Sequence, residues 1–305
     1  MSEETSQPRA ASAPRPGTVR ELLRATRPRQ WAKSLLVFAA PLLSGRFTEG
    51  DVLVDAAVAF VAFTLAAAGI YLVNDVRDVE SDRAHPTKRR RPVAAGTLSA
   101  TTAAWAGGVL GVAALLVASA AGFDLVVVIA IYLALSLLYC LLLKDEPVVD
   151  IAIIASGFLL RAIAGGAAAG IELSQWFLLA ASFGSLFMAA GKRYAEILLV
   201  AQGGPALRAS LASYSPSYLR FVWTVSAGLL IMTYGLWAFE LGEDVGGNSW
   251  YVASMAPFVL AVLRYALDVD RGTAEEPEEL ALRDRTLEAF ALCWLVMVAI
   301  AVYST

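Results

Sequence analysis

The sequence predicts an all-α membrane protein, a bundle of nine transmembrane helices with its N-terminus in the cytoplasm. Of its 305 residues, 58% are hydrophobic and only 17% are charged, and the mean hydropathy is +0.63. Soluble globular chains average roughly 45–50% apolar and about 25% charged residues, so this composition excludes a soluble enzyme. The apolar residues form long stretches, and Lys and Arg gather between alternate stretches. We therefore expect membrane lipid as a partner and no nucleic acid.

A helix that crosses about 30 Å of hydrocarbon needs roughly 20 mostly apolar residues. Some of the stretches are short or joined by tight turns, so we expect tilted helices that pack as one bundle. The nine expected spans are Trp31–Leu43, Val52–Val73, Thr101–Ala121, Phe123–Leu143, Val148–Ala169, Gln175–Ala190, Ser217–Glu240, Tyr251–Leu267 and Leu287–Val302.

The distribution of positive charge sets the orientation, because Lys and Arg mark the cytoplasmic side of a membrane protein. Most of the 24 Lys and Arg residues lie before or at the start of the first stretch and in every second loop after it. The opposite loops hold only Arg46. An odd number of spans then places the N-terminus in the cytoplasm and the C-terminus outside.

Residues 1–26 are rich in Pro, Ser, Ala and Arg and lack the apolar core of a signal peptide. We expect a disordered cytoplasmic tail over 1–26 and a single transmembrane domain over 27–305. The two cysteines, Cys140 and Cys293, lie in apolar stretches and are interpreted as small hydrophobic side chains. Arg161 lies inside the fifth stretch, where a charge costs at least a few kcal/mol. We expect it to face the bundle interior with a structural partner, for which Glu240 is the candidate.

The end of the second stretch carries four oxygen-bearing side chains, Asn74, Asp75, Asp78 and Asp82. If the helix continues, a rotation of about 100° per residue places all four within one arc. Three like charges on one face repel unless a cation lies between them, and oxygen ligands suit Mg²⁺. The alternative is a solvated acidic helix end that neighbouring arginines balance. We prefer the metal site, because such a face at the membrane surface has no packing purpose.

A basic run, Lys88-Arg89-Arg90-Arg91-Pro92, follows the acidic face. Positive charge at the cytoplasmic membrane edge is sufficient to explain it. Guanidinium groups also match phosphate oxygens, so the same run predicts a phosphate clamp beside the metal. Both interpretations stay open.

These motifs resemble those of a known family. The pattern Asn74-Asp75-x-x-Asp78-x-x-x-Asp82, followed by Lys88, Arg91-Pro92 and Gly96, resembles the first aspartate-rich motif of the UbiA superfamily of intramembrane prenyltransferases. Arg27-Pro28-x-Gln30-Trp31-x-Lys33 is similar to the opening signature of that family, and Tyr139-x-x-x-x-Lys144 to another of its motifs. The resemblance runs from about residue 24 to the C-terminus. It implies a UbiA-like catalytic domain over 27–305.

One segment departs from the usual pattern of the family. Ordinary members carry a second aspartate cluster between spans six and seven, which helps a second metal to bind a prenyl diphosphate. Here the segment reads Gly191-Lys192-Arg193-Tyr194-Ala195-Glu196, with two cations and a single acid. Such a site favours one magnesium-bound diphosphate together with a further phosphate group. In this respect the chain resembles the mycobacterial branch that transfers phosphoribosyl groups.

That resemblance implies 5-phosphoribosyl 1-diphosphate as donor, decaprenyl phosphate as acceptor and Mg²⁺ as cofactor, at the cytoplasmic face of the plasma (inner) membrane, for arabinan precursors. It implies Mg²⁺ on the catalytic residues Asp75, Asp78 and Asp82, with Asn74 in support. Donor phosphates would contact Lys88, Arg89 and Arg91. The ribose 5-phosphate or the lipid phosphate would contact Lys144, Lys192 and Arg193. The remaining expected contacts are Gln30 and Lys33 for the acceptor head, Tyr194 and Glu196 for ribose hydroxyls, and the motif residue Tyr139.

Two other functions compete with this one. An ordinary prenyltransferase needs the second carboxylate cluster, which the sequence lacks. A transporter is expected to place charges near the midplane and to show related halves, whereas these charges gather at one face. Small-residue patches such as Ala164–Ala167 permit close helix contacts within one chain or in a homo-oligomer.

Overall fold

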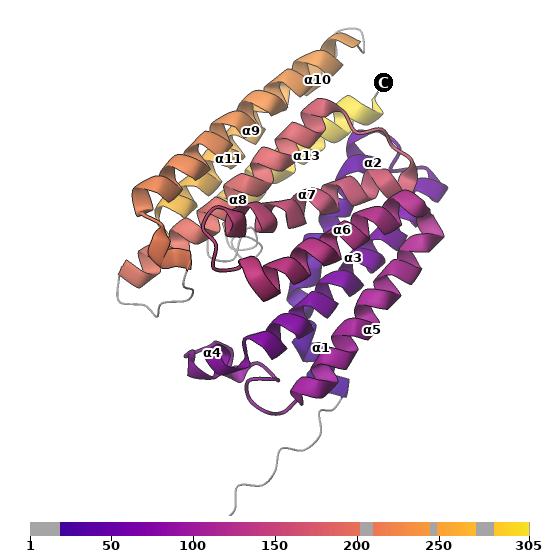
Figure 1. The fold of residues 1–305 in the computed structure, drawn as a ribbon. Coiled ribbons are helices and arrows are strands. Elements are labelled where there is room, and N and C mark those ends of the chain that lie inside the picture. The colour runs from indigo at the N-terminus through magenta and orange to yellow at the C-terminus, as the bar shows by residue number, and fades with distance from the viewer. Residues whose placement is uncertain (1–18, 202–209, 245–248, 273–283, 305) are drawn as a thin grey trace, which may run out of the picture.

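All regular structure is helical in the part of the chain that the computed structural model describes, residues 19–201, 210–244, 249–272 and 284–304 (Figure 1). The label η denotes a 3₁₀- or π-helix. The elements are α1 (Val19–Ala25), η1 (Pro28–Phe38), α2 (Ala39–Leu43), α3 (Gly50–Arg77), α4 (Val79–Ala84), η2 (Lys88–Arg90), α5 (Ala100–Ala118), η3 (Ser119–Ala121), α6 (Phe123–Leu138), η4 (Tyr139–Leu143), α7 (Val149–Ala169), α8 (Gln175–Ala201), η5 (Ser210–Ser213), α9 (Pro216–Asp244), α10 (Ser249–Ala253), α11 (Met255–Asp270) and α13 (Arg285–Tyr303).

The bundle has two groups of helices that meet along α7 and α8 (Figure 1). One core joins α3, α5, α6 and α7 around Phe63, Ile129 and Tyr132. A second joins α7, α8, α9 and α11 around Phe187, Tyr194 and Trp223. Helices with so many apolar residues bury some of their side chains against neighbouring helices, and their other apolar side chains face the lipid.

Glycines allow two of the closest backbone contacts. A Cβ on Gly69 of α3 would lie 2.8 Å from the Gly107 carbonyl oxygen of α5. A Cβ on Gly165 of α7 would lie 1.8 Å from the Val37 carbonyl oxygen of η1. Small residues bring helices together in this way in membrane bundles. The patch Ala164–Ala167 therefore makes a contact within the chain.

Seven of the described helices are long and apolar enough to cross a membrane, so the expected count of nine is not confirmed. Two expected spans are not among the seven. Trp31–Leu43 is wound as η1 and α2, and Gln175–Ala190 lies inside the longer α8. The seven are Gly50–Arg77, Ala100–Ala121, Phe123–Leu143, Val149–Ala169, Pro216–Gly242, Ser249–Asp270 and Arg285–Tyr303.

The N-terminal segment corrects the expected boundary at residue 26. Residues 1–18 lie outside the described part of the chain, but Val19–Ala25 forms α1. Ala25 is buried in a small core with Leu72 of α3, and Leu22 packs against it. The segment folds because these apolar side chains cover the end of α3, which composition alone did not indicate.

Arg161 lies in the bundle interior as expected, but Glu240 is not its partner. Its guanidinium donates to the carbonyl oxygen of Gly157 at 2.6 Å and to the Tyr132 hydroxyl at 3.4 Å. The same group lies over the ring of Phe63, 4.8 Å from its centroid. Glu240 is exposed on α9. Aromatic rings and a helix carbonyl therefore stabilise the buried charge.

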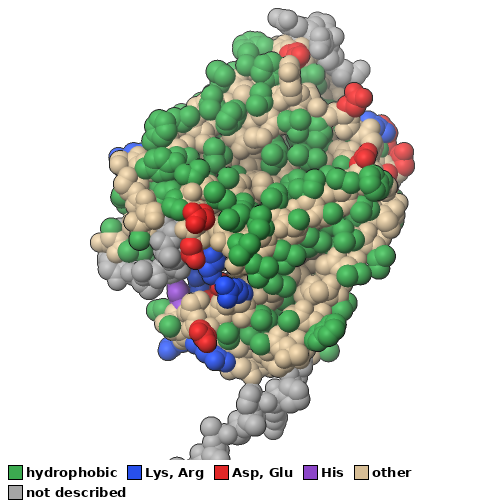
Figure 2. Space-filling model, viewed as in Figure 1, with side chains coloured by type: hydrophobic (Ala, Val, Ile, Leu, Met, Phe, Trp, Pro, Cys, Tyr) green, Lys and Arg blue, Asp and Glu red, His purple; other side chains and the backbone are tan. Residues whose placement is uncertain are grey.

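The polar site lies at one end of the bundle. Hydrophobic side chains cover most of the face in view, and most of the Lys and Arg side chains lie toward the end where α4 lies, while Asp and Glu side chains are seen at both ends (Figure 2). The C-terminus lies at the opposite end, where Tyr303 donates to the carbonyl oxygen of Leu42. The chain thus runs from the polar end to the far end between Arg27 and Leu43.

Candidate active site

The acidic motif occupies the junction of α3 and α4 at the polar end. Asp75 lies in the last turns of α3, Asp78 is the single residue between the helices, and Asp82 lies in α4. The backbone keeps helical hydrogen bonds across the break, from Asp78 N to Asn74 O at 2.9 Å and from Asp82 N to Asp78 O at 2.8 Å. The chain therefore follows a helical path through the acidic motif, as expected, with a break between α3 and α4 at Asp78.

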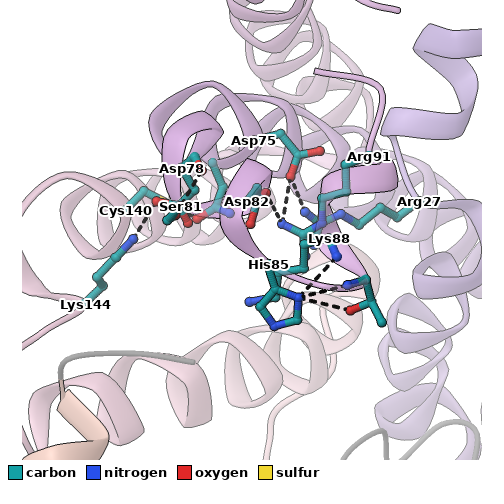
Figure 3. Close-up of polar contacts among 12 residues, drawn as sticks. Arg27, Asp75, Asp78, Ser81, Asp82, His85, Lys88, Arg91, Cys140 and Lys144 are labelled. Carbon is teal, nitrogen blue, oxygen red and sulfur yellow. Dashed lines mark hydrogen bonds and ion pairs between the residues drawn. The ribbon is translucent and has the colours of Figure 1, made fainter. Parts of the chain in front are cut away.

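Asp75 and Asp82 face the same cation. Nη1 of Arg91 lies 2.7 Å from Asp82 Oδ2 and 3.3 Å from Asp75 Oδ1. Arg27, which precedes η1, forms a second ion pair with Asp75 (Figure 3). Both carboxyl groups are almost completely buried, so each depends on its cation to offset the cost of leaving water.

Asp78 points to a different partner. The Nζ atom of Lys144, which follows η4, lies 2.5 Å from Asp78 Oδ1 (Figure 3). The lysine side chain is 27% exposed and the aspartate side chain 17% exposed, so this pair is open to a ligand. The three carboxylates form the acidic cluster. Within it, Arg91 contacts both Asp75 and Asp82, whereas Lys144 contacts Asp78.

The loop after α4 is folded onto itself. The ring Nδ1 of His85 accepts hydrogen bonds from the backbone N–H groups of Thr87 and Lys88, each at 3.2 Å. Burial, followed by the charge of Lys88, lowers the pKa of His85 below its usual value. The imidazole is therefore neutral at pH 7 and fixes the start of the basic run.

The donor chemistry of the acidic motif fits Mg²⁺, although its side chains do not form a closed ligand set. Among the described residues, no group of three His, Cys, Asp or Glu side chains lies at metal-binding spacing. Asp75 and Asp82 nevertheless share one nitrogen of Arg91, and carboxylate oxygens are hard ligands that Mg²⁺ prefers. The ion pairs with Arg91 and Lys144 occupy the oxygens that such an ion would use.

Arg193, expected to contact a substrate phosphate, lies in an internal ion-pair network. It is fully buried, with Nε 2.9 Å from Asp150 Oδ2 and Nη1 2.7 Å from Glu196 Oε2. Nη2 donates to the Tyr139 hydroxyl at 3.4 Å. Tyr139, Arg193 and Glu196 therefore act together as an internal network between η4, α7 and α8, because each is held by another protein group.

The other predicted residues divide into near and distant ones. Asn74 lies beside the cluster, with Oδ1 3.6 Å from Cys140 Sγ. Lys33 lies 5.7 Å from the Phe158 ring centroid, on the side of α7 that faces η1. Tyr194 points away from the acidic motif, since its hydroxyl accepts a hydrogen bond from Arg220 at 2.6 Å. Gln30, Lys88 and Lys192 are half-buried and Arg89 is exposed at this end of the bundle.

Sequence reasoning omitted three residues from the site. Arg27 stood in a recognised motif, but its contact with Asp75 depends on a backbone φ of 55° that no pattern reveals. Asp150 is the acceptor for Arg193, a contact between α7 and α8 that its position near a helix end does not reveal. Tyr214 gave no signal, because its partner Asp150 is distant in the sequence.

A helical membrane bundle with carboxylates and cations at one end is the architecture of an intramembrane transferase, and family comparison agrees. Residues 35–294 match the UbiA prenyltransferase family. The chain belongs to that family.

Among relatives of this chain is the decaprenyl-phosphate phosphoribosyltransferase of Mycolicibacterium smegmatis, which is 52% identical over 99% of this chain and 98% of that protein. The protein of the same name from Mycobacterium tuberculosis is 53% identical over 92% of this chain and 94% of that one.

Solved structures show the same fold. A UbiA homolog from Archaeoglobus fulgidus bound to DMAPP and Mg²⁺ superposes with a TM-score of 0.71 at 17% identity, covering 93% of this chain and 99% of that one. The homolog from the same organism bound to GPP and Mg²⁺ gives 0.70 at 16% identity, covering 93% of this chain and 100% of that one.

Proposed function

We propose that this chain transfers the 5-phosphoribosyl group from 5-phosphoribosyl 1-diphosphate to decaprenyl phosphate and releases diphosphate. The observation that carries the proposal is the 52% identity, over 99% of the chain, to the mycobacterial decaprenyl-phosphate phosphoribosyltransferase. The acidic cluster at the bundle end supports it, because a donor with a diphosphate needs a charged site beside the membrane.

Charge balance favours a metal-bound donor. Asp75, Asp78 and Asp82 are paired with Arg27, Arg91 and Lys144, so the cluster has no surplus of positive charge for a free diphosphate. Mg²⁺ on the three aspartates, with Asn74 in support, provides that charge.

When bound, the ion would neutralise the charge that develops on the departing diphosphate. Two of the three cations, Arg91 and Lys144, are the ones that would exchange, and their side chains are 25% and 27% exposed. Each can release its carboxylate to the metal and bind a phosphate oxygen in its place. Arg91 holds it through a guanidinium fork and Lys144 through a flexible amine. Lys88 and Arg89 extend the positive surface beside them.

The reaction breaks the bond between ribose C1 and the diphosphate oxygen and forms a bond from C1 to an oxygen of the lipid phosphate. A phosphate monoester has a second pKa of about 6 and is already largely ionised at pH 7. The acceptor therefore needs no general base. This agrees with the loop role of His85, whose Nδ1 is engaged by its own backbone.

The Lys192–Glu196 segment supports a phosphate over a second metal. Its acid, Glu196, is paired with Arg193, so it is not free to bind a cation in the described structure. Lys192 is half-buried at the same end of the bundle and adds positive charge. An ordinary prenyltransferase is the competing candidate. The Glu196–Arg193 ion pair counts against it, because this acid is not available to a second metal.

We also propose nine spans with the N-terminus in the cytoplasm of a multi-pass plasma (inner) membrane protein. Pro28–Phe38 is a 3₁₀-helix of 11 residues, and α2 adds 5. At rises of about 2.0 and 1.5 Å per residue, this segment reaches about 30 Å, the thickness of the hydrocarbon core. The 27 residues of α8 extend about 40 Å.

Three other details are proposals of the same kind. The active site faces the cytoplasm, because the Lys and Arg residues gather at that end. The lipid product serves arabinan precursor synthesis, as the family branch implies. Homo-oligomer formation stays a prediction, since Gly165 already contacts Val37 within the chain.

The test uses purified protein in detergent with Mg²⁺, decaprenyl phosphate and radiolabelled 5-phosphoribosyl 1-diphosphate. We expect label in the lipid extract, and we expect EDTA or Asp78→Ala to abolish it. Restoring Mg²⁺ after EDTA should restore transfer to the wild-type chain. Transfer that survives EDTA would contradict the role of the metal.

A further inference from the structure

Two non-glycine residues in the described part of the chain have a positive φ, Arg27 at 55° and Val148 at 69°. Val148 is the more unusual, because a β-branched side chain at positive φ is a genuine outlier. Such residues persist only where their surroundings hold them, and they cluster at functional sites. Arg27 is held by Asp75. Val148 ends the turn that begins at Lys144.

A tyrosine from a distant part of the chain holds this turn. The hydroxyl of Tyr214 accepts a hydrogen bond from the backbone N–H of Val148 and donates one to Asp150 Oδ1 at 2.5 Å. Tyr214 is buried and stacks on Tyr218 at 5.8 Å between centroids. Burial, then its bond to Asp150, raises the pKa of Tyr214, so the hydroxyl stays protonated as the donor.

The other end of the same segment is held through Asp150 as well. Asp150 Oδ2 accepts from Arg193 Nε at 2.9 Å, and Arg193 Nη2 donates to the Tyr139 hydroxyl at 3.4 Å. Tyr139 begins η4, a π-helix of 5 residues that leads directly to Lys144. Single turns of π-helix are frequent at functional sites. Both ends of residues 139–148 are therefore attached to one buried carboxylate.

We propose that Tyr214 is a positioning residue whose hydroxyl holds the Lys144–Val148 turn in its strained form and thereby keeps Lys144 against Asp78. The inference rests on the proposed function, in which Lys144 binds a substrate phosphate. Without the hydroxyl, the Val148 N–H and Asp150 Oδ1 lose their shared partner, and the backbone of Val148 relaxes toward negative φ. The Lys144 amine then leaves its place opposite Asp78.

The first test measures hydrogen exchange of the full-length chain in detergent and does not depend on activity. In Tyr214→Phe, the amides of residues 144–146 and 148–150 should exchange about tenfold faster, with the far end of the bundle unchanged. The matched control is Tyr218→Phe, which removes a hydroxyl from the exposed stacking partner. Unchanged exchange in Tyr214→Phe would overturn the proposal.

The second test is a double-mutant cycle on transfer kinetics. Tyr214→Phe should raise the same substrate KM as Lys144→Ala and lower kcat/KM about tenfold, the effect of losing about 1.4 kcal/mol of transition-state stabilisation. On a Lys144→Ala background, Tyr214→Phe should add less than about twofold. Fully additive losses would overturn the link to Lys144. If the wild-type chain transfers no phosphoribosyl group, the proposed function fails, while hydrogen exchange still decides whether Tyr214 holds the turn.

Discussion

At the residue scale, Asp75 and Asp82 are seven positions apart in the sequence and both contact one nitrogen of Arg91. Their burial makes them costly to ionise unless a cation is near, and Arg91 meets that need in the described structure. In the proposed function, a metal with a bound diphosphate would replace Arg91. The same carboxylate oxygens would then act as metal ligands, and the ion pairs would keep the site folded before the substrate binds.

Replacing Arg91 by lysine tests this shared contact. A lysine amine is a point charge without the planar fork, so it cannot hold Asp75 and Asp82 in the same geometry. We expect Arg91→Lys to lower kcat/KM for transfer by about tenfold or more. The control is Arg90→Lys at the exposed neighbour, which should stay within about twofold. Because lysine keeps the positive charge, transfer at the wild-type level in Arg91→Lys would show that only the charge of the basic run matters and would contradict the shared contact.

Arg161 has a structural role that can be separated from catalysis. Its guanidinium packs among Phe63, Tyr132 and Phe158 in the bundle interior. We expect Arg161→Ala to cost about 2–4 kcal/mol through the cavity and the lost contacts, and to lower the melting temperature by several degrees. KM values of the protein that remains folded should be unchanged. Normal melting with lost activity would contradict the structural role.

At the element scale, the contact between η1 and α7 fixes where the N-terminal motif lies. Gly165 leaves room for the Val37 carbonyl, and this brings the segment that carries Arg27 and Lys33 against α7. The 3₁₀ winding of η1 stretches 11 residues further than an α-helix would. A short segment can thereby connect the polar end to the far end of the bundle.

Substitution at this glycine should disturb the site from a distance. A Cβ in Gly165→Ala would meet the Val37 oxygen at 1.8 Å, so η1 must move. We expect a lower melting temperature and at least a tenfold loss of transfer. Gly108→Ala is the matched control, because nothing lies within 4 Å of its added Cβ and alanine favours a helix. The melting temperature and the transfer rate should be measured for both variants. Equal values in Gly165→Ala and Gly108→Ala would contradict the role of the close contact between Gly165 and Val37.

The apolar stretches predicted the helical bundle and seven of its long helices, because hydrophobic length is a local signal. The acidic motif and Lys144 were also found from spacing and family motifs. The pairing of Arg193 with Asp150 was not predicted, since this buried contact arises from tertiary packing that its neighbours in sequence do not indicate. Tyr214 was missed for the same reason, and α1 because short amphipathic segments look like a tail.

At the scale of the whole molecule, the acidic motif and the basic run lie together at one end of an apolar bundle. Most of the Lys and Arg side chains in view gather there, while the rest of this face is largely hydrophobic (Figure 2). A water-soluble donor and a lipid acceptor can meet only at such an edge.

The orientation of the bundle is testable with single cysteines on a Cys140→Ala, Cys293→Ala background. In intact cells, a membrane-impermeant maleimide should label Ser304→Cys at the C-terminus and should not label Glu80→Cys beside the acidic site. Permeabilised cells should allow both to react, which controls for accessibility. Labelling of Glu80→Cys in intact cells would place the site outside and reverse the proposed topology.

The most direct measurement offers both donors to the wild-type chain in one reaction. Detergent-purified protein with Mg²⁺ would receive 5-phosphoribosyl 1-diphosphate and a prenyl diphosphate, together with decaprenyl phosphate and an aromatic acceptor. Mass spectrometry of the lipid extract identifies the bond that forms. We predict phosphoribosylated decaprenyl phosphate, with one diphosphate released for each product and an unmodified aromatic acceptor. A prenylated aromatic product without phosphoribosyl lipid would contradict it.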